Sequence, residues 1–180
     1  MPVLLLFLEL RLQERFLPWR FCISVKLISN LLNSIDKDSI KLINKQLKLI
    51  RTAIKNEPIN SDLLNQLNEK LNINSEFKKY RFRSSTNAED IDGFNGAGLY
   101  ESKTGILNDS IKSFEKAIKQ VWASVWNENS YWEREIFNID QSKIAMGILV
   151  HRSFPDELAN GVVITKNLYR DVFPGYTVNI

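Results

Sequence analysis

The chain has 180 residues, with 24 basic and 21 acidic side chains and a formal net charge of +3 at pH 7. Hydrophobic residues make up 44% of it and charged residues 25%, a balance typical of a globular protein with one hydrophobic core. Because the basic residues are spread along the whole chain, no stripe indicates nucleic-acid binding, and we expect no nucleic-acid partner.

The N-terminal segment begins with an apolar run, Met1–Leu8, but charged residues from Glu9 onward make it too short for a membrane-spanning helix of about 20 residues. It also lacks the basic start and the small-residue cleavage site of a signal peptide. The single cysteine, Cys22, excludes an intramolecular disulfide and a cysteine metal cluster and favours a reducing compartment. We therefore expect a cytoplasmic protein with no membrane partner, with residues 1–17 unassigned and Cys22 packed in the core.

Two amphipathic helices are predicted in the first half of the chain. Isoleucine and leucine recur at helical spacing from Ile40 to Ile54, with lysines between them. Pro58 disfavours a helical residue before it and therefore ends this helix. A second helix is predicted from Ser61 onward, because leucines continue at helical spacing to Leu71.

Residues 78–83 alternate charged and aromatic side chains, as a strand with one buried face does. Tyr80 and Phe82 fall on one side of this predicted strand, and Arg81 and Arg83 fall on the other. The segment from residue 83 to residue 105 is rich in Gly, Ser, Thr and Asn and is predicted to be a loop that can approach a ligand closely.

A long amphipathic helix is expected to begin at Asn108 or Asp109, with an apolar face from Ile111 to Val125. Its aromatic residues, Trp122 among them, are interpreted as core residues.

Strands are predicted at residues 143–150 and 161–165, which are rich in Val and Ile, and residues 176–179 are also strand-like. Helices that precede and separate strands in this way predict an α+β fold.

The residues most suited to chemistry lie at 83–90, RSSTNAED, where a guanidinium and three hydroxyls stand at a strand end before the glycine-rich loop. A polyphosphate is bound by a fixed cationic fork, unobstructed backbone N–H groups and hydroxyls. The same composition is also that of an ordinary surface loop, and the segment matches neither a Walker A nor a dinucleotide motif. Composition alone leaves both interpretations open.

The string RSSTNAEDIDGFNGAGLYES at residues 83–102 resembles the nucleotide-binding loop of the pyruvate phosphate dikinase and phosphoenolpyruvate synthase family, which glucan water dikinases share. The resemblance continues through residues 122–126, 134–135, 146–151 and 154–165 and covers most of residues 78–180. Upstream, Pro18–Ser24 resembles the family's Pro-x-Gly-Phe strand segment, with Arg20 in place of the glycine.

The resemblance implies an ATP-grasp fold, in which two α+β subdomains close over ATP and a histidine on a separate domain becomes phosphorylated. Residues 18–180 would then form a partial ATP-grasp domain, roughly the first subdomain. His151 is the only histidine, but the Thr- and Gly-rich motif of the family's phosphohistidine is missing around it, so it is not interpreted as the phosphocarrier.

Carried over position by position, the resemblance implies a set of nucleotide-contacting residues. Arg83, as the catalytic residue, would contact the ATP phosphates, and Ser84 would bind the nucleotide beside it. Gly98 and Ser102 would lie against the nucleotide. Arg134 would be a second phosphate-side arginine, and His151 would meet the adenine at the hinge between subdomains. The residue patterns alone leave alternatives open. His151 also fits a locally hydrogen-bonded strand end. Arg134, expected on a helix between two glutamates, also fits a solvated ion-pairing residue.

Compared with the family, the sequence lacks an N-terminal glycine-lysine phosphate loop, the acidic magnesium ligands of the second subdomain, and the phosphohistidine and pyruvate domains. We therefore expect no metal ligands in this chain, with Mg²⁺ and pyruvate or phosphoenolpyruvate held by other parts of the enzyme. Whether the chain is an enzyme by itself stays open. The alternatives are a non-catalytic remnant, a split-enzyme subunit that docks a complementing polypeptide, or part of a glucan water dikinase-like enzyme.

Overall fold

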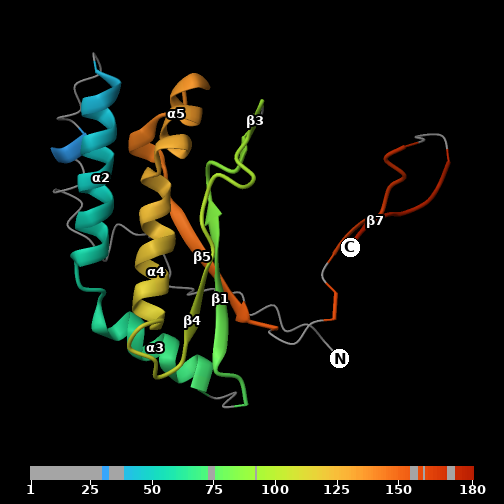
Figure 1. The fold of residues 1–180 in the computed structure, drawn as a ribbon, viewed down its shortest axis with the longest axis horizontal. Coiled ribbons are helices and arrows are strands. Elements are labelled where there is room, and N and C mark those ends of the chain that lie inside the picture. Colours follow the sequence, from blue (N-terminus) through green and yellow to red (C-terminus); the bar gives the residue numbers. More distant parts are fainter. Residues whose placement is uncertain are drawn as a thin grey trace, which may run out of the picture.

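The computed structural model describes residues 30–32, 39–72, 76–91, 93–154, 158–159, 161–169 and 173–180. The expectations for residues 1–17, for Pro18–Ser24 and for Cys22 lie outside these residues. The described part combines helices with antiparallel strands, so the α+β prediction is confirmed (Figure 1).

The two predicted N-terminal helices are confirmed as α2 (Ile40–Asn56) and α3 (Ser61–Asn72). Ile43, Leu47, Ile50 and Ile54 lie buried on one face of α2, as their spacing predicts. The helix ends at Asn56, and the next residue, Glu57, has the extended backbone that is favoured before a proline.

A three-stranded antiparallel sheet contains β1 (Lys79–Thr86) at its centre, with β4 (Lys103–Ile106) on one side and β5 (Met146–Arg152) on the other. β1 is the strand predicted from alternation, and it continues to Thr86. β4 overlaps the end of the segment predicted to be a loop, and that part of the prediction is wrong. A four-residue strand with a central glycine carries too little alternation to be recognised in the sequence.

The helix expected from Asn108 or Asp109 begins later, as α4 (Phe114–Ala123). The Asp109 carboxylate instead accepts hydrogen bonds from the Ile111 and Lys112 amides and forms a turn. Ser113 is the N-cap of α4, and its hydroxyl accepts from the Lys116 amide. Ile111 therefore precedes the helix and is 78% exposed, so the expected core position for it is wrong.

After α4 the chain forms a 3₁₀ turn, η2 (Ser124–Trp126), the helix α5 (Glu128–Ile136) and a second 3₁₀ turn, η3 (Gln141–Lys143). α5 confirms the expected helix at Arg134, whereas η3 follows from none of the sequence patterns considered above. The strand predicted at 143–150 begins only at Met146, because the Asp140 carboxylate caps η3 by accepting from the Ser142 amide.

Two short hairpins complete the described chain. β2 (Asp90–Ile91) pairs with β3 (Phe94–Asn95) inside the segment predicted to be a loop. β6 (Val162–Ile164) pairs with β7 (Thr177–Asn179), which confirms the strands predicted at 161–165 and 176–179. The β7 end of the chain lies apart from the helices and the main sheet (Figure 1).

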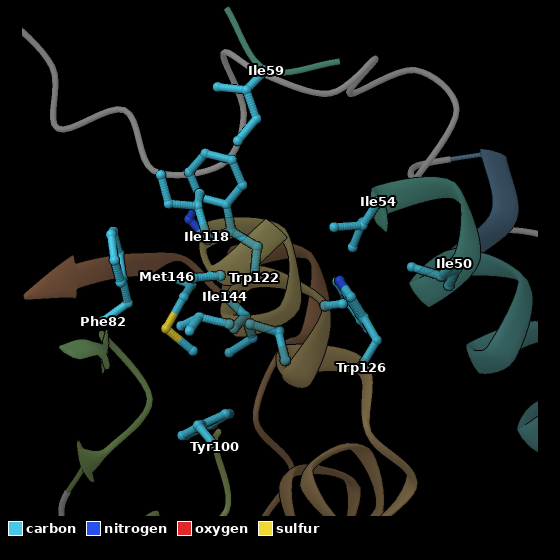
Figure 2. Close-up of a cluster of buried hydrophobic side chains, with 14 of the residues drawn as sticks. Ile50, Ile54, Ile59, Phe82, Tyr100, Ile118, Trp122, Trp126, Ile144 and Met146 are labelled. Atoms are coloured by element: carbon cyan, nitrogen blue, oxygen red, sulfur yellow. The ribbon is translucent and has the colours of Figure 1, made fainter. Parts of the chain in front are cut away.

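The core lies between the main sheet and α2, with α4 between them (Figure 1). Figure 2 shows Trp122 and Met146 between Phe82 on the sheet side and Ile50 on α2. Phe114 packs edge-to-face against Tyr80 and at a tilt against Phe82, with ring centroids 5.6 and 5.4 Å apart. The aromatic residues of α4 are therefore core residues, as predicted. None of the described helices is long and apolar enough to cross a membrane.

This packing predicts that Gly105→Ala destabilises the fold. A Cβ atom at Gly105 would lie 2.6 Å from Phe82 Cε2 and 2.7 Å from Phe114 Cδ1. Overpacking of this kind costs about 1–3 kcal/mol of unfolding free energy, measurable by urea denaturation. Gly175→Ala is the matched control, since a Cβ atom there meets nothing closer than 3.8 Å. Equal stability of the two variants would contradict this account of the core.

Candidate functional site

The sheet has two unlike faces because side chains alternate along β1. Tyr80 and Phe82 are buried under α4, whereas Arg83 and Ser85 are exposed on the opposite face, called here the open face. Directly opposed residues of antiparallel strands share a face. Arg81, half-buried, lies opposite Thr104 of β4 and His151 of β5, so all three belong to the open face.

Arg83 is exposed on the open face, and among the described residues its guanidinium makes no hydrogen bond or ion pair. Arg81 differs, because its Nη1 donates to the Thr104 hydroxyl at 3.2 Å. Arg83 thus presents a permanently charged fork that is free to bind an anion.

Ser102 lies directly before β4. The β1–β4 ladder ends with the pair Phe82 and Lys103, so its register predicts that Ser102 lies near Arg83. Ser102 is two residues before Thr104, and side chains two apart in an extended chain point to the same face, so Ser102 is expected on the open face. The register thus predicts a guanidinium near a hydroxyl at the end of β4.

The loop before Ser102 contains two glycines with different roles. Gly98 has a φ of +81°, a left-handed conformation that other residues adopt only with strain. At Gly96 a Cβ atom would lie 2.7 Å from the Ala88 carbonyl oxygen, so this position has no room for a side chain.

His151 is half-buried on β5, and its Nδ1 lies 2.7 Å from the Arg152 carbonyl oxygen. Through its partner Arg81 it shares the open face with Arg83, as a diagonal neighbour across the two strands. The local hydrogen bond matches the strand-end alternative. His151 also lies on the open face, the same face as Arg83, as a contact with a ligand bound by Arg83 would require.

Ser84 lies away from the other candidates. It sits one residue beyond Arg83 on β1 and pairs with Ile148, so it belongs to the helix-covered face.

Arg134 is 0% exposed, so the alternative of a solvated ion-pairing residue is wrong. Its guanidinium donates to Gln141 Oε1 at 2.8 Å, to the Val125 carbonyl at 2.7 Å and to the Tyr100 hydroxyl at 3.3 Å. Burial lowers the pKa of Arg134, and the nearby Tyr100 opposes that shift. Arg134 is bound by protein acceptors inside the core, and we propose a different role for it below.

The loop that carries Gly98 is tied to the helical layer by side chains. The Ser130 hydroxyl donates to the Leu99 carbonyl at 2.7 Å, and the Glu101 amide donates to the Ser124 hydroxyl at 3.1 Å. The Glu101 carboxylate in turn accepts from Asn127 Nδ2 at 3.0 Å. Sequence reasoning did not find these anchors, because small polar residues of a helix give no signal of a loop partner.

A cavity of about 450 Å³ lies behind this loop and is lined by Gly98, Leu99, Tyr100 and Glu101 together with Arg51 of α2 and residues 127–129. Arg51 is held in place, since its Nη1 donates to the Trp126 carbonyl at 2.6 Å and its Nη2 lies 3.6 Å from Glu128 Oε1. Neither Arg83 nor His151 borders the cavity. The cavity and the open face are therefore two separate places on the molecule.

The open face fits phosphate better than it fits a metal ion. It offers the guanidinium of Arg83, unpaired within the described residues, and the hydroxyls of Ser85 and Thr104. Within the described ranges, no group of three or more His, Cys, Asp or Glu side chains converges on one point.

Comparison with known proteins identifies the family. The family model described as "Pyruvate phosphate dikinase, AMP/ATP-binding domain" matches residues 24–178. The chain belongs to this family. The phosphoenolpyruvate synthase of Pyrococcus furiosus is 26% identical over 147 residues, and the probable phosphoenolpyruvate synthase of Pyrococcus abyssi is 25% identical over the same length. Each alignment covers 78% of this dikinase-family chain but spans 17% of the relative's length.

Acid should loosen the anchored loop of this dikinase-family chain through Glu101. Burial alone would raise the pKa of Glu101, but hydrogen bonds from Lys103 and Asn127 hold it below its usual range. The contribution of the ionised carboxylate to stability is therefore fully present above the usual glutamate pKa and is lost as pH falls through the lower folded pKa.

Between about pH 6 and pH 3, the range in which glutamate carboxyl groups become protonated, we expect the unfolding free energy of wild type to fall by more than that of Glu101→Gln. Urea denaturation across this range measures the difference. Lys103→Met, which keeps the carboxyl group but removes its partner, should lie between the two. Parallel pH profiles for wild type and Glu101→Gln would refute this role for the carboxylate.

Proposed function

We propose that this chain is the ATP-binding part of a phosphoenolpyruvate synthase-like dikinase, in which ATP phosphorylates a histidine carrier on another domain. In this proposal the described fold is roughly the first subdomain of an ATP-grasp-like domain. Membership of the AMP/ATP-binding domain family supports ATP as the ligand, and the names of the two Pyrococcus relatives favour pyruvate as the eventual acceptor.

The observation that carries the proposal is the exposed guanidinium of Arg83 on the open face, which has no partner among the described residues; the strand register supports Ser102 as its neighbour. Phosphoryl transfer depends on positioning a polyphosphate and neutralising its charge. Arg83 would bind phosphate oxygens, the Ser102 hydroxyl would take a further oxygen, and the backbone near Gly98 would approach without side-chain obstruction. His151, on the same face, would contact the adenine.

In this proposal Mg²⁺ would be bound by ligands on other parts of the enzyme. When bound, Mg²⁺ would neutralise charge on the phosphates. The residues described here would bind and orient the nucleotide. Pyruvate or phosphoenolpyruvate would likewise be bound by other parts of the enzyme.

A second candidate is a protein-interaction module that docks a complementing polypeptide. The β6–β7 hairpin favours it, because Val163, Tyr176 and Ile180 are 60%, 72% and 84% exposed. A split-enzyme subunit and a non-catalytic remnant both fit this surface. The two candidates differ in whether the isolated chain binds ATP.

Isothermal calorimetry and thermal unfolding with ATP, each with and without Mg²⁺, test the proposal. Arg83→Ala should raise the Kd for ATP about ten- to hundredfold, because a hydrogen bond to a charged group contributes about 1.5–3 kcal/mol. The thermal stabilisation by ATP should fall in parallel.

Lys48→Ala, on the exposed side of α2, is the charge-matched control and should bind ATP as wild type does. If millimolar ATP neither binds nor stabilises wild type, the proposed ATP site is wrong and the interaction module becomes the better account. If ATP binds equally to Arg83→Ala and wild type, the site lies elsewhere on the chain.

A further inference from the structure

The most fully buried charged group of the described chain, Arg134, is joined to the glycine-rich loop through one tyrosine. The side chain of Tyr100 is 9% exposed, and its hydroxyl donates to the Ala88 carbonyl at 3.1 Å. The same hydroxyl accepts from Arg134 Nη1 at 3.3 Å. Figure 2 shows Tyr100 at the edge of the buried cluster.

Tyr100 connects the two ends of the loop. Ala88 lies just after β1 and Tyr100 lies just before β4, so the hydroxyl–carbonyl bond closes the segment between these strands. Gly96 is part of the same arrangement, because its amide donates to the Glu89 carbonyl at 2.8 Å. The position of Gly98 is set by these ties at both ends of the segment.

Arg134 fixes Tyr100 from the helical side. Its two other hydrogen bonds reach the Val125 carbonyl of η2 and the Gln141 side chain of η3. The guanidinium carbon also lies 6.0 Å from the centroid of the Tyr100 ring and 5.7 Å from that of Trp126. Because the Arg134 guanidinium is planar and has three bound acceptors, its orientation is fixed. Its hydrogen bond to the Tyr100 hydroxyl therefore also fixes the orientation of Tyr100.

We infer that Arg134 and Tyr100 are positioning residues that hold the loop from Gly96 to Ser102 in the conformation that receives the nucleotide phosphates. This inference rests on the proposed ATP site and adds a role for residues that do not touch the ligand. A loop held in place before binding loses less conformational entropy when the ligand arrives. The hydrogen-bonded pair of Arg134 and Tyr100, called here the strut, therefore raises the affinity for ATP without contacting it.

Three variants of the full chain test this role. Tyr100→Phe removes the hydroxyl that joins Ala88 to Arg134, and Ser130→Ala removes the separate bond to the Leu99 carbonyl. Tyr80→Phe is the matched control, because Tyr80 is buried and its hydroxyl donates to the Leu71 carbonyl at 2.9 Å, away from the loop. Urea midpoints should fall by similar amounts in the two tyrosine variants.

The first readout is amide hydrogen exchange without nucleotide. The Leu99 amide donates to the Gly96 carbonyl and the Glu101 amide to the Ser124 hydroxyl, so both should exchange about tenfold faster in Tyr100→Phe and Ser130→Ala, and at the wild-type rate in Tyr80→Phe. Similar loop exchange in Tyr100→Phe and Tyr80→Phe would overturn the inference.

The second readout is the Kd for ATP, which should rise about tenfold in Tyr100→Phe and Ser130→Ala and stay unchanged in Tyr80→Phe. Faster loop exchange with unchanged ATP affinity would also overturn the inference, because the loop would then not need positioning. A wild-type chain that binds no ATP refutes the proposed function instead, and the exchange measurement still decides whether the strut holds the loop.

Discussion

The register of β1 is the constraint on which the rest of the structure depends, because β1 alone pairs with both neighbours in the main sheet. Its alternation places Phe82 in the core and Arg83 on the open face. A slip of one residue would exchange these faces and bury the arginines. Gly105 resists such a slip, since Phe82 and Phe114 together fill the space above it. Core packing therefore determines which side chains the candidate site presents.

The elements that could be predicted are those with long, regular patterns. α2 has four turns of apolar spacing and β1 has strict alternation, so both were predictable in type. The start of α4 was not, because Asp109 and Ser113 are both good N-caps and the choice depends on whether Ile111 or Phe114 reaches the core. β4 was not predicted, because its four residues are too few to show a clear alternation of side chains. Arg134 was misjudged because its neighbours in the chain are glutamates, whereas its bound acceptors become adjacent only after folding.

The candidate site shows the same division between local pattern and tertiary arrangement. Arg83 and His151 come from different strands, and the antiparallel register brings them to one face, on which it also predicts Ser102. Their sequence spacing carries no geometric information about this, so the motif resemblance was the one available signal. Ser84 stands beside Arg83 in the chain yet occupies the other face of the sheet. Neighbouring residues of one strand point to opposite faces of a sheet, whereas residues opposite each other on paired strands share a face.

The open face is suited to binding a polyphosphate more than to transferring one. Arg83 is exposed, and a charge pair at the protein surface is weakened by the high dielectric of water. The same guanidinium would act far more strongly under a second layer that excludes water, which is how preorganised charge stabilises a developing phosphoryl group. In the proposed dikinase this covering layer would also bring the magnesium ligands. Affinity for ATP and competence for transfer are thus separable properties, and the strut formed by Arg134 and Tyr100 serves the first of them.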